Sequence, residues 1–183
     1  DWLRLSPFPR TRLPHLEPPS ALPQEQGFAW WVTESTFSMD GDGPRIDHLL
    51  AHLRGGGCLY LDEAHALGLY EGGRGRAHAL ALPATAIVGP LGKAFGYAGA
   101  FVAGSPTLCD WLRARARSFV YSTSTTPLSA VHIRRRVTEL CSGDGDRRRA
   151  HLWRNVERFA THFPTRFAST TTGDLSPIFP FRV

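Results

Sequence analysis

Short apolar runs alternate with longer amphipathic segments along most of this chain. Four of these runs, at residues 28–33, 58–61, 85–88 and 100–103, are bounded by glycine, proline or polar residues, which is typical of buried strands. The segments between them and after them repeat apolar residues at helical spacing. Strands that alternate with helices predict a layered α/β domain built on a mainly parallel sheet.

Helices are predicted where apolar spacing coincides with a capping residue. Pro44 suits the first turn of a helix that the glycines at 55–57 end. Ser105-Pro106 combines an N-cap residue with a proline at the first helical position, which predicts a helix through about Arg117.

Two further helices are expected in the last third of the chain. One spans residues 127–140, and Gly143-Asp144-Gly145 should break the chain before the other, which ends near Phe163. Residues 178–183 have an extended pattern. At the other end, six prolines within residues 1–27 exclude a long regular helix over most of that segment.

Composition narrows the class of protein. An apolar content of 42% is enough for a buried core, and a net charge of +5 permits acidic partners without requiring them. We expect no nucleic-acid partner, because no basic stretch is interleaved with aromatic residues. We expect no membrane partner, because no apolar run reaches the length of a spanning helix. Three cysteines without a Cys-x-x-Cys pair indicate neither a disulfide framework nor zinc, and fit a reducing, cytoplasmic setting.

Lys93 is the only lysine in the sequence, and it lies in the glycine-rich segment Gly89–Gly96. Arginine stays protonated, whereas lysine can lose its proton and attack a carbonyl to form a Schiff base. The alternative is that the sequence simply favours arginine and that Lys93 is an ordinary surface residue.

Polar side chains follow three of the predicted strands. Ser38 comes shortly after the first, Asp62 directly after the second, and Lys93 in the turn after the third. Ligands of open parallel sheets bind at the carboxyl ends of the strands, so one crevice is expected to hold all three. An aspartate near a Schiff-base lysine is the arrangement that pyridoxal phosphate (PLP) needs, because the carboxylate keeps the pyridine nitrogen protonated. His65 would face the same crevice if the turn after Asp62 is helical.

The amino-acid sequences of several segments are similar to those of one enzyme family. These segments are Thr33–Asp42, Asp62–Gly68, Gly92–Gly96, Ala98–Ser105, and Tyr121–Ser124 followed by Pro127. They resemble, in order and spacing, the α-oxoamine synthases, which are PLP-dependent enzymes of the aspartate-aminotransferase fold. Ser176-Pro177-Ile178 extends the resemblance toward the end of the chain.

The resemblance implies a role for each matching residue. Lys93 would carry PLP and later move the α-proton of the bound amino acid, with Asp62 on the pyridine nitrogen and His65 on the phenolic oxygen. Ser38 would order that edge of the ring. Ser122 and Thr123 would approach the phosphate in the neighbouring subunit of a homodimer.

The resemblance also implies a reaction and a domain division. The wording is most similar to the family member that joins L-alanine to a pimeloyl thioester in biotin biosynthesis, with loss of carbon dioxide and the thiol. Members that use glycine or serine share the same central motifs. Residues 1–142 would belong to the large PLP-binding domain, and residues 143–183 would begin the small C-terminal domain.

Some features depart from the family pattern. Pro90 stands where the family usually has a threonine that donates to the phosphate, and proline has neither a hydroxyl nor an N–H. The chain also corresponds to the middle of an enzyme about twice as long, so an isolated segment is expected to be inactive. A truncated or degenerate synthase fold without activity is therefore the main alternative.

Two other motifs compete with this interpretation. Asp62-Glu63-Ala64-His65 is also the acidic box of a helicase ATPase, but positions 87 and 94 lack the glycine and the Ser or Thr of a phosphate-binding P-loop. His48 and His52 share a helical face, which is the spacing of a metal-binding pair. The zinc-protease form needs glutamate after the first histidine, so we expect both to be solvated helix residues.

Overall fold

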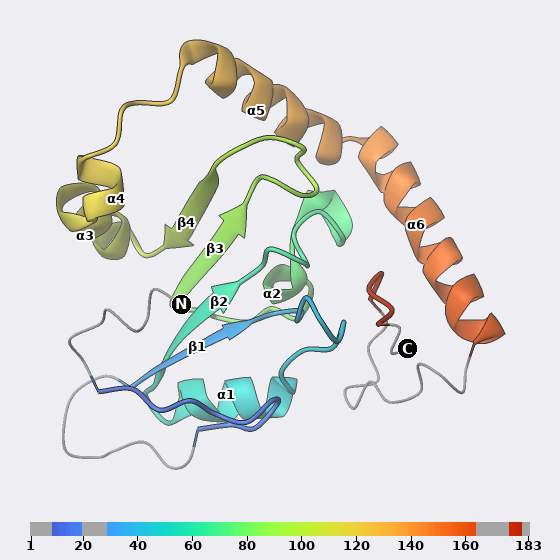
Figure 1. Ribbon diagram of the computed structural model, residues 1–183, viewed down its shortest axis with the longest axis horizontal. Helices are drawn as coiled ribbons and strands as arrows, with labels where there is room; N and C mark the ends of the chain where they lie inside the picture. Colours follow the sequence, from blue (N-terminus) through green and yellow to red (C-terminus); the bar gives the residue numbers. More distant parts are fainter. Residues whose placement is uncertain (1–8, 20–28, 164–175, 181–183) are drawn as a thin grey trace.

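A four-stranded sheet forms the centre of the computed structural model, which describes residues 9–19, 29–163 and 176–180 (Figure 1). The strands are β1 (Trp30–Glu34), β2 (Cys58–Asp62), β3 (Ala86–Pro90) and β4 (Ala100–Gly104), in that order across the sheet. The first three are parallel, and β4 runs antiparallel to β3. The expected strands and the mainly parallel α/β sheet are confirmed.

One face of the sheet carries the core. The burial of alternate residues in β2 leaves Leu59 and Leu61 fully buried, because successive side chains of a strand point to opposite faces. Helix α1 (Ile46–Arg54) contributes Leu49 to this core, and the short helix α2 (Arg76–Ala79) contributes Ala77. The two helices therefore help to bury the apolar face of the sheet.

The expectation that both histidines of α1 are solvated is wrong for His52. Its side chain is buried, and its Nε2 lies 3.0 Å from the Cys58 carbonyl oxygen.

The opposite face and the last strand are more open. Trp30 and Val32 are exposed in β1, and all five residues of β4 are exposed. Helix α3 (Pro106–Arg115) and helix α4 (Arg117–Val120) follow β4 and have no buried residue. Exposed apolar residues therefore occur on β1, on β4 and on the two helices after β4.

The predicted helix after Ser105 is confirmed at its start and corrected at its end. The Ser105 hydroxyl accepts a hydrogen bond from the Leu108 amide, with Pro106 at the first position of the helix. The helix ends at Arg115, because Ala116 has an extended backbone (φ −68°, ψ 109°), and α4 starts afresh at Arg117.

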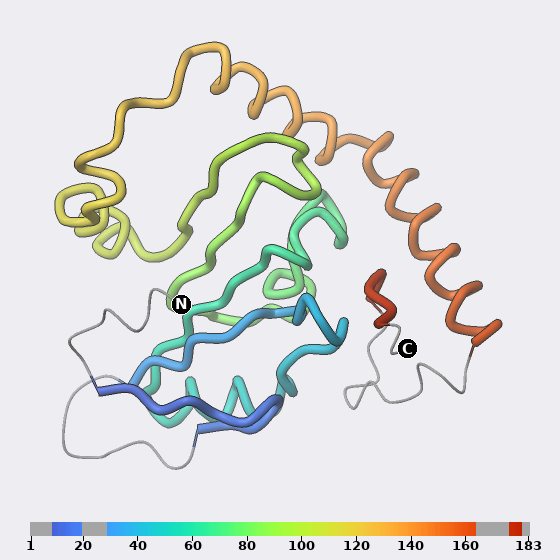
Figure 2. Tube along the Cα trace, in the orientation of Figure 1, coloured from blue at the N-terminus to red at the C-terminus, as the bar shows by residue number. Residues whose placement is uncertain are grey.

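Two helices make an arch over one side of the sheet (Figures 1 and 2). Helix α5 (Pro127–Leu140) has its predicted bounds, but α6 (Gly143–His162) begins earlier than expected. The prediction that Gly143-Asp144-Gly145 breaks the chain is wrong, since these residues form the first turn of α6. The Ser142 hydroxyl accepts from the Gly145 amide, and this N-cap outweighs the glycines.

The remaining segments are irregular or very short. A 3₁₀ turn, η2 (Glu71–Gly73), lies between β2 and α2, and Gly73 packs against Leu140 at the end of α5. Residues 176–180 form no strand, and the rest of the predicted extended end, like Phe28 in the first predicted strand, lies outside the described residues. None of the helices in the described ranges combines the length and apolarity that crossing a membrane requires.

Candidate functional site

The carboxyl ends of the three parallel strands lie side by side at one end of the sheet and are joined by hydrogen bonds. Glu34 at the end of β1 is in register with Asp62 at the end of β2, and Asp62 is in register with Val88 of β3. The Ser35 amide donates to the Asp62 carbonyl at 2.8 Å, and the Glu63 amide donates to the Val88 carbonyl at 2.9 Å. Side chains that leave these strand ends therefore share one location.

The residues after β2 make a single turn that returns His65 toward Asp62. The Leu67 amide donates to the Glu63 carbonyl at 2.8 Å, which closes the turn. Within it, Asp62 Oδ1 accepts a hydrogen bond from the Ala64 amide at 2.8 Å. The turn is helical in spacing, as the placement of His65 required.

Lys93 is held at the tip of a folded turn after β3. The amide of Gly96 donates to the Lys93 carbonyl at 2.9 Å, and the amide of Tyr97 donates to the Leu91 carbonyl at 3.0 Å. Leu91 and Phe95 are buried and anchor the turn, while Lys93 itself is exposed. The turn therefore presents the amine away from the core.

The two turns touch each other at Gly68 and Ala94. Gly68 has a φ of +90°, and a Cβ atom built there would lie 2.4 Å from the Ala94 Cβ. Two methyl groups cannot occupy this space, so glycine allows the segment after Asp62 to pack against the turn that carries Lys93.

The charged groups at the strand ends act on the pKa of His65. Partial burial is the main cause that lowers the pKa of His65, and the positive charge of Lys93 lowers it further. The carboxylates of Glu34 and Asp62 act in the opposite direction, raising the pKa. The structure thus brings Asp62, His65 and Lys93 together and favours a neutral imidazole at pH 7.

Ser38 does not join these three residues in the described part of the chain. It is exposed in a tight turn after β1, where the Phe37 amide donates to the Asp42 carbonyl at 2.7 Å. The end of the chain packs on the same turn, since a Cβ atom on Gly41 would lie 2.3 Å from the Ile178 carbonyl oxygen. Ser38 is thus at the expected strand end, without a hydrogen bond to the site residues.

Ser122 and Thr123 lie elsewhere. Both are exposed on the connection between α4 and α5, and the Ser122 hydroxyl donates to the Phe119 carbonyl at 3.0 Å. Figure 1 places this connection beyond β4, on the far side of the sheet from β1.

Glu34 is a member of the site that sequence reasoning missed. The family-like segment Thr33–Asp42 contains Glu34 but gives it no role, whereas the strand register pairs Glu34 with Asp62. The signal that could have found it is its place at the end of an apolar run.

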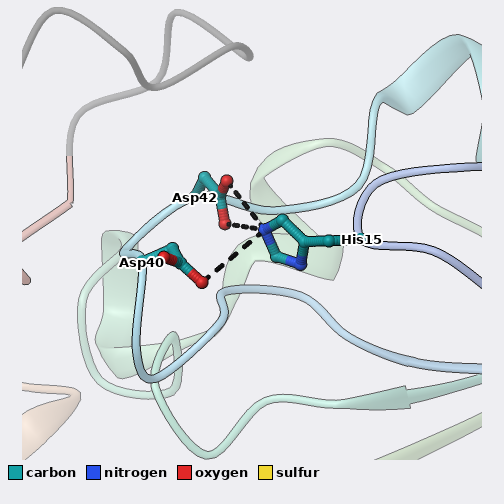
Figure 3. A group of neighbouring side chains, drawn as sticks. All are labelled: His15, Asp40 and Asp42. Carbon is teal, nitrogen blue, oxygen red and sulfur yellow. Dashed lines mark hydrogen bonds and ion pairs between the residues drawn. The ribbon is translucent and has the colours of Figure 1, made fainter.

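A second group of polar side chains, also missed, lies between the N-terminal segment and the turn after β1. Figure 3 shows the His15 ring beside the carboxyl groups of Asp40 and Asp42. His15 Nε2 lies 3.1 and 3.0 Å from the two Asp42 oxygens and 3.8 Å from Asp40 Oδ2. Such a group can hold a metal ion, but direct hydrogen bonding already accounts for its geometry. We assign it the role of fastening residues 9–19 to this turn.

The residues at the strand ends fit PLP. The exposed Lys93 amine can bond to the aldehyde of the cofactor, and a neutral His65 can donate a hydrogen bond to an oxygen atom. The Asp62 carboxylate, half-buried beside them, can pair with a protonated ring nitrogen. A phosphate-binding P-loop, as in a helicase ATPase, would not require this combination of a lysine, a histidine and an aspartate.

Comparison with known proteins identifies the class. The family model for aminotransferase class I and II matches residues 12–183. The chain therefore belongs to the aminotransferase class I and II family, and its homologues over this central portion are α-oxoamine synthases.

Individual relatives narrow the comparison. The 8-amino-7-oxononanoate synthase of Burkholderia thailandensis is 41% identical over 131 residues, which cover 69% of this chain and 33% of the relative. The chain thus spans about a third of the length of the curated relatives it matches.

Solved structures agree with this assignment. A Sphingomonas wittichii serine palmitoyltransferase aligns over 79% of this chain and 37% of its own, with a TM-score of 0.69 and 27% identity. The 8-amino-7-oxononanoate synthase of Francisella tularensis aligns over 84% and 46%, with a TM-score of 0.67 and 27% identity. A serine palmitoyltransferase from S. paucimobilis, solved with bound PLP–myriocin aldimine, aligns over 74% and 35% with a TM-score of 0.65 and 25% identity.

Proposed function

We propose that this chain is the central part of a PLP-dependent acyltransferase that joins an amino acid to an acyl thioester with loss of carbon dioxide. The observation that carries the proposal is the meeting of Asp62, His65 and Lys93 at the strand ends. The similarity to 8-amino-7-oxononanoate synthases favours L-alanine and a pimeloyl thioester as substrates, and biotin biosynthesis as the pathway.

Each residue has a distinct task in this reaction. The Lys93 amine would hold the cofactor and, once the amino acid has displaced it, would move the α-proton in its neutral form. Asp62 holds a proton on the ring nitrogen, and His65 donates to the phenolic oxygen. When bound, PLP supplies the electron sink for the carbanion that forms at the amino acid.

We also propose that the complete enzyme is a cytoplasmic homodimer. Ser122 and Thr123 are exposed and lie away from Lys93, so they suit a phosphate bound in the neighbouring subunit. Exposed apolar residues lie just before them, with Phe119 and Val120 at the end of α4 and Tyr121 directly after it. Sedimentation that found an active monomer would contradict this proposal.

The second candidate is a synthase fold without activity. Pro90, the last residue of β3, favours this candidate because it can donate no hydrogen bond to a phosphate. The two candidates differ in whether the protein binds PLP covalently.

A chimera tests the proposed function in a chain of natural length. In this chimera, the matched 131 residues of the Burkholderia thailandensis synthase are replaced by the corresponding residues of this chain. We expect PLP to give a visible absorption band, and borohydride reduction followed by peptide mapping to place the label on Lys93. The Lys93→Arg variant should lose the band. A colourless chimera, or a label that persists in Lys93→Arg, would overturn the proposal.

A further inference from the structure

Two oppositely charged side chains are buried close to the site, although the proposed reaction uses neither. Glu63, the residue after Asp62, is only 3% exposed, and Arg76 is only 5% exposed. Charged side chains are seldom buried this deeply unless other polar groups hold them, because burial removes their hydration. Their surroundings therefore indicate what they do.

Glu63 joins the end of β2 to the start of α2. Its Oε1 accepts a hydrogen bond from the Ala77 amide at 2.7 Å, so the carboxylate satisfies a backbone donor in the first turn of the helix. The contact depends on a glycine, since a Cβ atom on Gly75 would lie 1.7 Å from Glu63 Oε2. The carboxylate thus occupies the space that a side chain at position 75 would fill.

Arg76 joins the same helix to the residue that follows β1. Its Nη1 donates to the Ser35 carbonyl at 2.6 Å. A second glycine makes room for this contact, because a Cβ atom on Gly43 would lie 2.1 Å from Arg76 Nη1. The Ser35 amide in turn donates to the Asp62 carbonyl at 2.8 Å.

These contacts close a ring that starts and ends at Asp62. It runs through Glu63, α2, Arg76 and Ser35 and returns to the Asp62 carbonyl, while the Glu63 amide is fixed to β3. We propose that Glu63 and Arg76 are positioning residues that set the direction of the Asp62 carboxylate, an inference that rests on the proposed function. The peptide groups on both sides of Asp62 are held by hydrogen bonds. Its carboxylate therefore reaches the pyridine nitrogen of the cofactor without first having to be ordered.

The ring can be tested without a cofactor in the 183-residue chain. Glu63→Ala removes both carboxylate oxygens, so the Ala77 amide loses its acceptor and the ring is cut. We expect hydrogen exchange at the Ser35 and Ala64 amides to become about tenfold faster, because the segment around Asp62 then opens more often. Glu71→Ala, an exposed change in η2, is the matched control and should leave both rates unchanged. Unchanged rates in Glu63→Ala would overturn the inference.

A second readout separates positioning from simple stability. In the chimera, Glu63→Ala should weaken PLP binding about tenfold and move the pH midpoint of its visible band by about one unit, because a displaced Asp62 no longer holds the proton on the pyridine nitrogen. A lower melting temperature with an unchanged pH midpoint would assign Glu63 a purely structural role and overturn the inference.

Two possible failures are kept apart. If the unmodified chimera takes up no PLP, the proposed function fails, and the exchange rates in the 183-residue chain still decide whether the ring holds Asp62. If Glu63→Ala does not fold, Arg76→Lys replaces it, because lysine keeps the charge but loses the planar guanidinium that reaches Ser35. The same exchange and absorbance changes are expected for that variant, and their absence overturns the inference.

Discussion

Replacing Gly68 with alanine should separate the two turns that form the candidate site. The residue has a φ of +90°, and its added Cβ would lie 2.4 Å from the Ala94 Cβ. The backbone conformation alone costs alanine about 1–2 kcal/mol. Forcing an extra methyl group into a filled space adds about 1–3 kcal/mol.

Gly56 provides the matched control for the backbone cost. Its φ is +85°, nearly the same as that of Gly68, but a Cβ atom there would meet nothing within 4 Å. Gly56→Ala should therefore destabilise the chain by the backbone cost of about 1–2 kcal/mol only. The difference between the two variants measures the contact with Ala94.

A rescue variant completes the test. With Ala94→Gly in the Gly68→Ala background, the nearest remaining atom would be the Cα of residue 94 at 3.9 Å, an ordinary contact. Urea unfolding should then recover about 1–3 kcal/mol, a midpoint shift of about 1 M. If Gly68→Ala costs no more than Gly56→Ala, or Ala94→Gly gives no rescue, the turns do not touch as described. The placement of His65 beside Lys93 would then be wrong.

Three further predictions concern the site and its surroundings. Asp62→Asn in the chimera should still bind PLP but lose most of the exchange of the alanine α-proton in deuterated water, because the ring nitrogen loses its proton partner; unchanged exchange would assign Asp62 to structure. Pro90→Thr should restore a charge-assisted hydrogen bond worth about 1.5–3 kcal/mol and tighten PLP binding about tenfold to hundredfold, whereas equal affinities in a titration would show that position 90 does not face the phosphate. Burial raises the pKa of Glu63 above its ordinary value of 4.5, so native chains keep its proton to higher pH than unfolded ones. The stability from Glu63 is therefore complete below pH 4.5 and is lost as pH rises through the native pKa, and urea midpoints of Glu63→Gln should lack this part of the decline.

Much of the sheet and part of the site follow from local sequence. The strand that contains the buried Leu59 and Leu61 is recognisable in the sequence as a short apolar run. The start of α3 after Ser105 follows from the capping hydroxyl of that residue. The single turn that follows β2 has the short-range spacing that the placement of His65 assumes, while the role of His65 stays a prediction. Each of these predictions depends on residues close together in the sequence.

The features that could not be predicted depend on contacts between distant segments. Glu34 enters the site through its register with Asp62, and the ring through Arg76 depends on a carbonyl 41 residues away. The antiparallel direction of β4 likewise follows from pairing with β3 rather than from its own residues. The break predicted at Gly143 is wrong for a local reason. The hydroxyl of Ser142 caps the helix there, and this cap outweighs the helix-breaking effect of the glycines.

The open edge of β4 has a practical consequence for handling the protein. Its five residues are exposed and its outer backbone groups have no neighbouring strand among the described residues, so it is a ready template for pairing with another chain. The 183-residue chain should aggregate as its concentration rises, through pairing at this strand. A charged residue in place of the exposed Val102 would oppose this edge-to-edge pairing without changing the core. The substitution is therefore a useful first change before crystallisation or NMR.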